Sequence, residues 1–328
     1  MIISRTPFRV SFFGGGTDFP EFYERHGGAV LLTTINKYCY ISIHKLSAFF
    51  AHRFRASYAR TEMVQEPSEF QHPLIRECLL HLPPTEGLEI AHVSDLPGRT
   101  GLGTSSSFTV GLLHALHAME GGRVTAEDLA REAILIERER VGDAGGHQDQ
   151  YAAAYGGLIR IDFAGRNSVA IRRLPLNIER LNALENQLML FYTGVEQSAE
   201  QILSEQKKRT SQNEAALMKM RDMVDQATES LCGEGSLEDF GRLLHESWEQ
   251  KKTLSSGISN PLVDEAYAAA RKAGALGGKL LGAGGRGFLL LFARTEAHDA
   301  IRTALPKLRE VNFRFSMEGS RIIFKAAE

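Results

Sequence analysis

The segment Pro97 to Ser107, PGRTGLGTSSS, constrains the fold of this chain more than any other. Glycines at positions 98, 101 and 103 allow the backbone to turn so that several amide N–H groups converge. Four consecutive hydroxyl residues, Thr104 to Ser107, follow, and apolar residues then recur at helical spacing as far as Met119. This pattern predicts a turn that leads from a strand into the N-terminus of a helix.

A turn of this kind is suited to binding phosphate. Converging amides and the positive end of a helix attract an anion, and the hydroxyl groups can donate to phosphate oxygens or ligate magnesium. The plain alternative is a strand-to-helix turn in which a serine caps the helix. The sequence contains neither a GxxxxGK[ST] phosphate loop nor a GxSxG nucleophile elbow.

Strand and helix patterns elsewhere in the chain predict an α+β protein of two domains, residues 1–170 and 171–328, with the boundary between residues 165 and 182. In the first domain a box formed by Thr125 and Asp128 opens a helix through about Val141. The expected strands of this domain are 2–13, 29–43, 88–93 and 158–163, and a further helix is expected at 147–155.

The second half is richer in helical patterns and should form helices packed on an antiparallel sheet. Its expected strands are 187–192 and 288–292, with extended segments at 309–315 and 321–324. Its expected helices are 213–231, 237–252, 261–273 and 296–308.

Charge and cysteine content argue against several classes of partner. The net charge is −2 and both signs are mixed along the chain, which is not typical of a nucleic-acid or anionic-membrane binder. Arg5 and Arg9 interrupt the first apolar run, so it resembles neither a signal peptide nor a membrane span. Cys39, Cys78 and Cys232 are expected to be buried thiols in a reducing compartment, which favours a cytoplasmic protein.

The loop at 97–107 resembles the second signature, PxGxGLGSSAA, of the GHMP kinases, the superfamily of galactokinase, homoserine kinase, mevalonate kinase and phosphomevalonate kinase. Thr104 replaces the first serine of that signature. The resemblance implies a two-domain fold with an N-terminal mixed sheet and C-terminal helices on an antiparallel sheet. It also implies that ATP lies on Pro97, Gly98, Gly101, Leu102, Gly103, Thr104, Ser105, Ser106 and Ser107, with Ser105 on the magnesium side.

The segment TPFRVSFFGGGTDF, residues 6–19, resembles the opening signature of sugar kinases. By that resemblance Arg9 lies near the reacting hydroxyl, and Thr17 and Asp18 contact the sugar. Gly15 and Gly16 replace a Glu-His pair that contacts galactose, which disfavours galactose and leaves room for a larger substrate. The alternative is that these glycines form only a tight turn.

Residues 279–292, KLLGAGGRGFLLLF, resemble the third signature of the same superfamily and imply that Gly284 lies at the phosphate site. The segment also contains GxGxxG at Gly282, Gly284 and Gly287. A dinucleotide fingerprint needs a strand before it and a helix after it, whereas here a strand pattern follows. A dinucleotide-binding domain is therefore excluded.

Phosphoryl transfer to an alcohol needs a base for the hydroxyl proton and a metal to neutralise the phosphates. Asp149 matches the catalytic aspartate of the sugar-kinase branch, and Glu137 lies at the spacing of its magnesium ligand, with Glu139 as a rival. Asp149 could instead be a first-turn helix residue, and residues 137–140 a solvated helix face. His147 is expected to be a structural or a substrate-contacting histidine, because no catalytic-triad pattern supports an acid/base role.

The stretch QDQYAAAYGG most resembles the bacterial heptose kinase and fucokinase branch. The resemblance implies an ATP- and Mg²⁺-dependent kinase that phosphorylates the anomeric hydroxyl of a heptose 7-phosphate. Another sugar 1-kinase, such as a fucokinase, and a non-catalytic ATP and sugar sensor are the alternatives. No nucleic-acid or membrane partner is expected, and a homodimer is compatible with the sequence. Lys37, Arg172 and Arg173 are candidates for holding the substrate phosphate.

Overall fold

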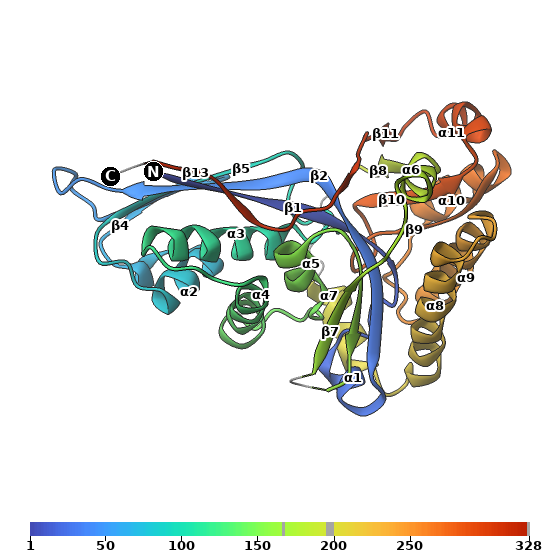
Figure 1. Cartoon of the computed structure of the whole chain (residues 1–328), viewed down its shortest axis with the longest axis horizontal. Helices are drawn as coiled ribbons and strands as arrows, with labels where there is room; N and C mark the ends of the chain where they lie inside the picture. The colour runs from blue at the N-terminus through green and yellow to red at the C-terminus, as the bar shows by residue number, and fades with distance from the viewer. Residues whose placement is uncertain (166–167, 195–199, 327–328) are drawn as a thin grey trace.

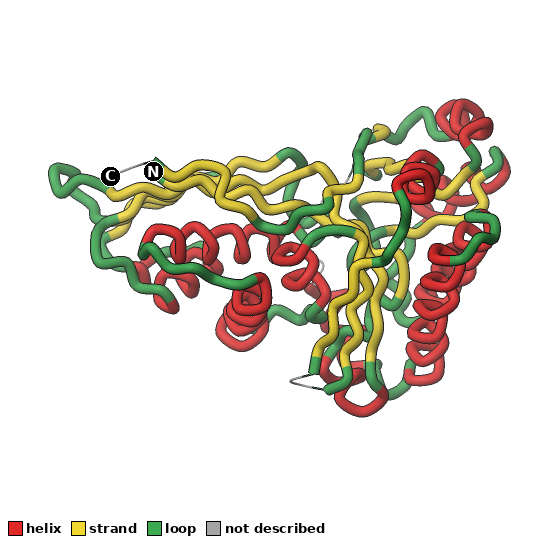
Figure 2. The backbone as a smooth tube through the Cα atoms, viewed as in Figure 1, coloured by secondary structure: helices red, strands yellow, loops and turns green. Residues whose placement is uncertain are grey.

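The computed structural model describes residues 1–165, 168–194 and 200–326. Within them, nine strands form the first sheet, and its longest members, β1 and β2, run antiparallel along most of their length (Figures 1 and 2). The strand order is β13, β1, β2, β5, β3, β4, with β6 and β12 also paired to β2 and β7 paired to β6. The bounds are β1 Ile2–Phe13, β2 Gly28–Lys45, β3 Phe54–Ser57, β4 Thr61–Val64, β5 Leu88–Ser94, β6 Leu158–Phe163, β7 Val169–Arg173, β12 Phe315–Ser316 and β13 Arg321–Lys325.

The burial of β1 explains how this sheet joins the two halves of the molecule. Alternate residues of β1 are fully buried up to Arg5, as in a strand with one open face, and every residue from Thr6 to Phe13 is buried. Helices pack on one face of the sheet, and the C-terminal helices α8 and α9 pack on the other face near the end of β1. The continuous run of buried residues therefore marks the stretch that is covered on both sides.

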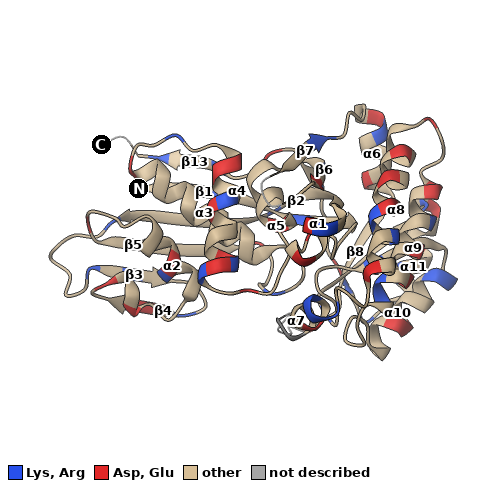
Figure 3. Cartoon of the chain, turned by 90° about the horizontal axis from the view of Figure 1, so that it is seen from below, with Lys and Arg blue, Asp and Glu red and all other residues tan. Residues whose placement is uncertain are grey.

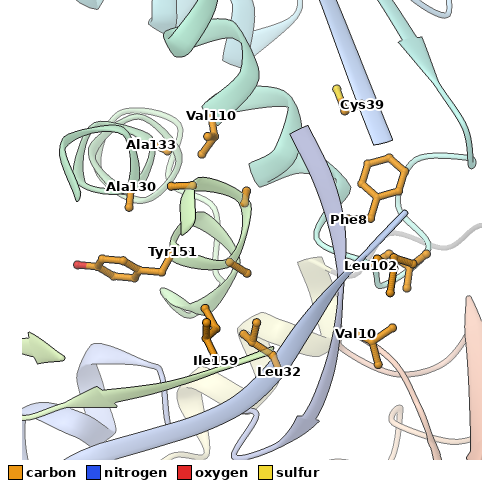
Figure 4. Close-up of a cluster of buried hydrophobic side chains, with 14 of the residues drawn as sticks. Phe8, Val10, Leu32, Cys39, Leu102, Val110, Ala130, Ala133, Tyr151 and Ile159 are labelled. Carbon is orange, nitrogen blue, oxygen red and sulfur yellow. The ribbon is translucent and has the colours of Figure 1, made fainter. Parts of the chain in front are cut away.

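Five helices accompany the first sheet: α1 Pro20–His26, α2 Pro73–His81, α3 Thr104–Met119, α4 Ala126–Ile134 and α5 Gln148–Tyr155. The box predicted at Thr125 and Asp128 does cap α4. Helix α3 lies along β1 and β2 and shares a buried core with them (Figure 4). Residues of this core include Phe8, Val10, Leu32, Leu102, Val110, Ala130, Ala133, Tyr151 and Ile159.

The second sheet is antiparallel and is covered by helices, as expected from the sequence. Its strand order is β11, β8, β10, β9, and a buried Trp248 on α9 lies in the core behind it. The bounds are β8 Leu188–Tyr192, β9 Ala275–Leu280, β10 Phe288–Ala293, β11 Arg309–Glu310, α6 Ile178–Asn186, α7 Glu200–Lys208, α8 Glu214–Cys232, α9 Glu238–Thr253, α10 Pro261–Lys272 and α11 His298–Ala304.

The structure corrects several local expectations. The helix expected to reach Val141 is α-helical only to Ile134, and residues Leu135–Arg140 form a π-helix. The helix expected at 296–308 is shorter, and only two residues at each end of the segment 309–316 are strand. Eight further elements were not predicted, and they are short or contain glycine: α1, α2, α6, α7, β3, β4, β7 and β9.

The division at residue 170 falls inside β7, which belongs to the first sheet, and β12 and β13 return to that sheet from the end of the chain. A single cut in the sequence therefore does not separate the two sheets, because each strand packs where its apolar face is covered, whatever its place in the chain.

Cys39 and Cys78 are buried as expected, but Cys232 is exposed at the end of α8, where the apolar stripe of that helix has ended. Acidic and basic residues are interspersed over the elements of the chain (Figure 3). Among the described residues, no helix is both long and apolar enough to cross a bilayer.

Candidate active site

The loop between β5 and α3 ends on Gly103, which caps α3 with a left-handed backbone, φ 71°. The Arg9 amide donates to the Leu102 carbonyl at 3.0 Å, so the loop is attached to β1. Ser107 Oγ donates to the Pro7 carbonyl at 2.8 Å and ties the first turn of α3 to the same strand. Because β1 is buried, the position of the helix N-terminus is fixed by the core of the protein.

The four hydroxyl residues of the loop differ in exposure. Ser106 and Ser107 are buried, whereas Ser105 is exposed and Thr104 is partly exposed. Thr104 Oγ1 accepts a hydrogen bond from the Arg99 amide at 3.2 Å. The hydroxyls available to a ligand at the start of α3 are therefore those of Thr104 and Ser105.

The third glycine segment lies against this loop, as the resemblance implied, but through different glycines. A Cβ atom on Gly282 would lie 2.4 Å from Gly101 Cα, and one on Gly287 would lie 2.2 Å from the Thr100 carbonyl oxygen. Gly284, the expected phosphate-site glycine, instead packs on the backbone of Ile258. The contact with the loop thus needs glycine at 282 and 287, whereas Gly284 packs the segment against the backbone of Ile258.

Asp149 and Arg9 form a two-pronged ion pair beside the loop. Arg9 Nε donates to Asp149 Oδ1 at 2.7 Å and Arg9 Nη2 donates to Oδ2 at 2.8 Å. A Cβ atom on Gly103 would lie 3.4 Å from Asp149 Oδ2, and Arg9 Nη1 also donates to the Gly101 carbonyl. The Asp149 side chain is 21% exposed and that of Arg9 is 7% exposed, so the carboxylate is the accessible member of the pair.

Asp18 joins the opening segment to the start of α5. Its carboxylate accepts hydrogen bonds from the amide of Gly16 at 3.0 Å and from the amide and side chain of Gln148 at 3.2 and 3.0 Å. Burial, and then the charge of Asp149, raise the pKa of Asp18. Asp18 is 1% exposed, so in this structure it fixes the two segments, rather than presenting an oxygen to a sugar.

The other residues expected to contact the sugar have different surroundings. Thr17 is fully buried, and its hydroxyl donates to the carbonyls of Gly14 and Ala29, so it closes the turn. Gly15 and Gly16 lie in that turn, and both are partly exposed. His147 makes a 3.0 Å hydrogen bond with the Tyr23 hydroxyl.

Burial, and then the charge of Arg138, lower the pKa of His147 to about 4. His147 is therefore neutral near pH 7 and is suited to hydrogen bonding rather than to acid catalysis.

Glu137 is buried under the first turn of α3, whereas Glu139 is exposed. Glu137 Oε2 accepts a hydrogen bond from Ser106 Oγ at 2.9 Å and another from Gln150. Burial raises the pKa of Glu137. The π-helix over Leu135–Arg140 directs this carboxylate inward, an irregularity that is frequent at functional sites.

Glu137 Oε1 is buried and has no hydrogen-bond partner among the described residues. A carboxylate oxygen without a hydrogen-bond partner, next to the Ser106 hydroxyl, is the kind of hard oxygen donor that Mg²⁺ prefers. The described residues contain no cluster of three or more His, Cys, Asp or Glu suited to a metal. A magnesium ion at Glu137 would therefore be completed by phosphate oxygens and water, which is usual for this ion.

The sequence reading missed Gln148, Gln150 and two buried lysines, Lys251 and Lys279, near Arg9 and Asp18. One signal was available for Lys251. It follows Phe240, Leu244, Ser247 and Trp248 on the buried face of α9, where an unpaired lysine is unusual.

The three candidates for holding a substrate phosphate do not converge on Asp149. Arg172 pairs with Asp162, and Arg173 donates to the carbonyls of Tyr155 and Met317. Lys37 lies in β2 where its pairing with β1 shifts between Pro7 and Phe8.

Both halves of the chain resemble known proteins. The family profile described as GHMP kinases N terminal domain matches residues 72–157, and that described as GHMP kinases C terminal matches residues 227–309. D-glycero-alpha-D-manno-heptose 7-phosphate kinase of Campylobacter jejuni is 30% identical over 97% of each chain. An L-fucokinase/L-fucose-1-P guanylyltransferase of Bacteroides fragilis is 30% identical over 72% of this chain and 26% of its own length.

Among solved structures, a D-glycero-D-manno-heptose 1-phosphate kinase of Bacteroides thetaiotaomicron superposes over the full length of both chains with a TM-score of 0.81 at 24% identity. This likeness shows the fold. The two profile matches and the full-length relative together show that the chain belongs to the GHMP kinase family of phosphotransferases that act on hydroxyl groups.

Proposed function

We propose that the protein transfers the γ-phosphoryl group of ATP to the anomeric hydroxyl of D-glycero-D-manno-heptose 7-phosphate, in the cytoplasm, for the synthesis of a nucleotide-activated heptose. The observation that carries the catalytic part is the Arg9–Asp149 pair, which lies at the start of α3 next to the glycine loop. The substrate is supported by the heptose 7-phosphate kinase relative, which matches 97% of this chain.

In this proposal the glycine loop and the N-terminus of α3 bind the phosphates of ATP, with Thr104 and Ser105 as hydroxyl donors. The sugar oxygen forms a bond to the γ-phosphorus while the bond from that phosphorus to the β–γ bridging oxygen breaks, and ADP leaves with the electron pair. The hydroxyl proton moves to the Asp149 carboxylate, the accessible member of the ion pair. Arg9 holds that carboxylate in one orientation and offsets developing negative charge.

Glu137 and Ser105 are the proposed magnesium-side residues. When bound, the ion would neutralise the phosphates. We expect Glu137→Gln to lower kcat by roughly 100-fold and to raise the Mg²⁺ concentration needed for half-maximal activity, because the amide is a poorer metal ligand. Glu139→Gln, two residues away on the exposed side, is the matched control and should behave as wild type. Equal losses in the two variants, measured by Mg²⁺ titration of ADP release, would contradict this assignment.

The substrate proposal is tested by offering purified protein Mg-ATP with heptose 7-phosphate, fucose, galactose or mevalonate and measuring ADP release. We expect turnover with heptose 7-phosphate and a new phosphorus resonance that correlates with the anomeric proton. Turnover with fucose alone would favour the alternative suggested by the fucokinase relative. Nucleotide binding without turnover of any sugar would favour a sensor.

A further inference from the structure

Lys251 on α9 is a buried lysine whose hydrogen-bond partners among the described residues are two backbone carbonyls. The residue is 5% exposed, and its Nζ donates to the carbonyl of Gly282 and, at 3.4 Å, to that of Leu280. Among the described residues Lys251 forms no ion pair, and it is the neighbouring Lys252 that pairs with Glu249. The ammonium group is therefore directed at the third glycine segment.

An ammonium group without a carboxylate partner is costly to bury. Burial, and then the positive charge of Arg9, lower the pKa of Lys251 to about 7, while Asp18 partly offsets them. Lys279 of β9 is a second buried cation nearby, and its Nζ donates to the Phe12 carbonyl at 2.8 Å. An apolar residue of similar length would fill the Lys251 position at a lower desolvation cost, so stability alone does not account for a lysine there.

The carbonyl that Lys251 holds belongs to the glycine that contacts the nucleotide loop. Gly282 is packed so closely on Gly101 that its own Cβ would lie 2.4 Å from Gly101 Cα. The carbonyl of Gly101 in turn accepts a hydrogen bond from Arg9, the partner of Asp149. A short chain of contacts thus runs from the Lys251 ammonium to the proposed catalytic pair.

We propose that Lys251 is a positioning residue for phosphoryl transfer: its ammonium group holds Gly282 and thereby fixes the surface on which the nucleotide loop rests at Gly101. This inference rests on the proposed function, because it takes the segment from Pro97 to Ser107 as the ATP site. It also gives α9 a role in ATP binding in addition to its role in the hydrophobic core.

The proposed role makes nucleotide binding depend on protonation. The charged groups around Lys251 are Arg9, Asp18 and Lys279, and the polyphosphate of ATP would add negative charge across the Gly101–Gly282 contact. Added negative charge favours the protonated form of a lysine and raises its pKa. At a pH between the pKa of Lys251 in the free protein, about 7, and its higher pKa in the ATP complex, ATP binding should be accompanied by proton uptake. Nucleotide affinity should therefore fall as the pH rises from about 7.

The test is calorimetry of wild type and Lys251→Met with magnesium adenylyl imidodiphosphate, a non-hydrolysable ATP analogue, at pH 7.5. Titration in two buffers of different ionisation enthalpy gives the protons taken up. We expect Lys251→Met to bind the analogue roughly 10-fold more weakly, the effect of one lost charge-assisted hydrogen bond, and to take up fewer protons than wild type. The affinity of Lys251→Met for the analogue should also no longer fall as the pH rises above 7.

Lys252→Met is the matched control, because Lys252 is the next residue of α9 but pairs with Glu249 at the surface. It should bind the analogue as wild type does. A purely structural Lys251 would lower the unfolding temperature without changing the proton uptake of the folded protein.

The outcomes separate the two proposals. Failure of wild type to bind the analogue would overturn the proposed function. Binding by wild type together with equal affinity and equal proton uptake in Lys251→Met would overturn only the role of Lys251.

Discussion

Asp149→Asn is expected to lower kcat by about 10³-fold, within the range of a lost general base, while the KM for ATP changes little. Asparagine has the same shape and can still accept one hydrogen bond from Arg9, but it does not accept the proton of the sugar hydroxyl. The carboxylate is accessible and lies next to Gly103, whereas the proposed phosphate contacts come from the loop and from α3. The loss should therefore fall on turnover, measured by ADP release with heptose 7-phosphate.

The variant also leaves the Arg9 guanidinium, which is 7% exposed, without a charged partner. Breaking a buried pair is destabilising, so the unfolding temperature must be measured before kcat is interpreted. Binding of the non-hydrolysable analogue at near wild-type affinity would show that the site is intact. A folded variant that retains turnover within tenfold of wild type would remove Asp149 from the proton-accepting role.

Gly101→Ala is expected to lower the free energy of unfolding by about 2–4 kcal/mol and to weaken ATP binding strongly. Gly101 has φ 82°, and its Cβ would lie 2.5 Å from the Leu281 carbonyl oxygen. The conflict is with backbone, so side-chain rotation does not relieve it. The loop and the third glycine segment would have to move apart, which would displace both the loop at Gly101 and the segment at Leu281 and Gly282. Urea unfolding and ATP titration measure the two effects.

Gly98→Ala is the control from the same loop. A Cβ at Gly98 would have no atom of the protein within 4 Å, and its φ lies outside the range that favours glycine. This variant should keep wild-type stability. Equal destabilisation by the two substitutions would show that the Gly101 contact has no special importance, and that any alanine in the loop is unfavourable.

Elements with a strong local pattern were predicted well from the sequence. The strand β1, the helix after the glycine loop, α5 and the Thr125 cap all formed as expected, because periodicity and capping act over a few residues. The π-helix was missed because an apolar stripe looks the same for a regular helix. The return of β13 to the first sheet was also missed, since strand pairing across most of the chain leaves no local signal.

The sequence predicted individual residues of the candidate site better than it predicted the contacts between them. Arg9 and Asp149 were both selected, yet their pairing across 140 positions is a property of the fold. Asp18 and Thr17 were expected to contact a sugar but accept or donate hydrogen bonds within the protein. Lys251 was not predicted to lie at the site, because a lysine is ordinarily solvent-exposed.

Local sequence therefore predicted the segments to which we assign the chemistry, because a glycine loop followed by a helix is a local pattern that does not depend on the rest of the fold. Only the tertiary structure decided which side chains those segments meet. It buried Glu137 rather than Glu139, brought Gly282 rather than Gly284 against Gly101, and placed a lysine behind that contact. The physical reason is that burial and hydrogen-bond partners depend on distance in space, which segments far apart in the sequence acquire only when the core packs them together.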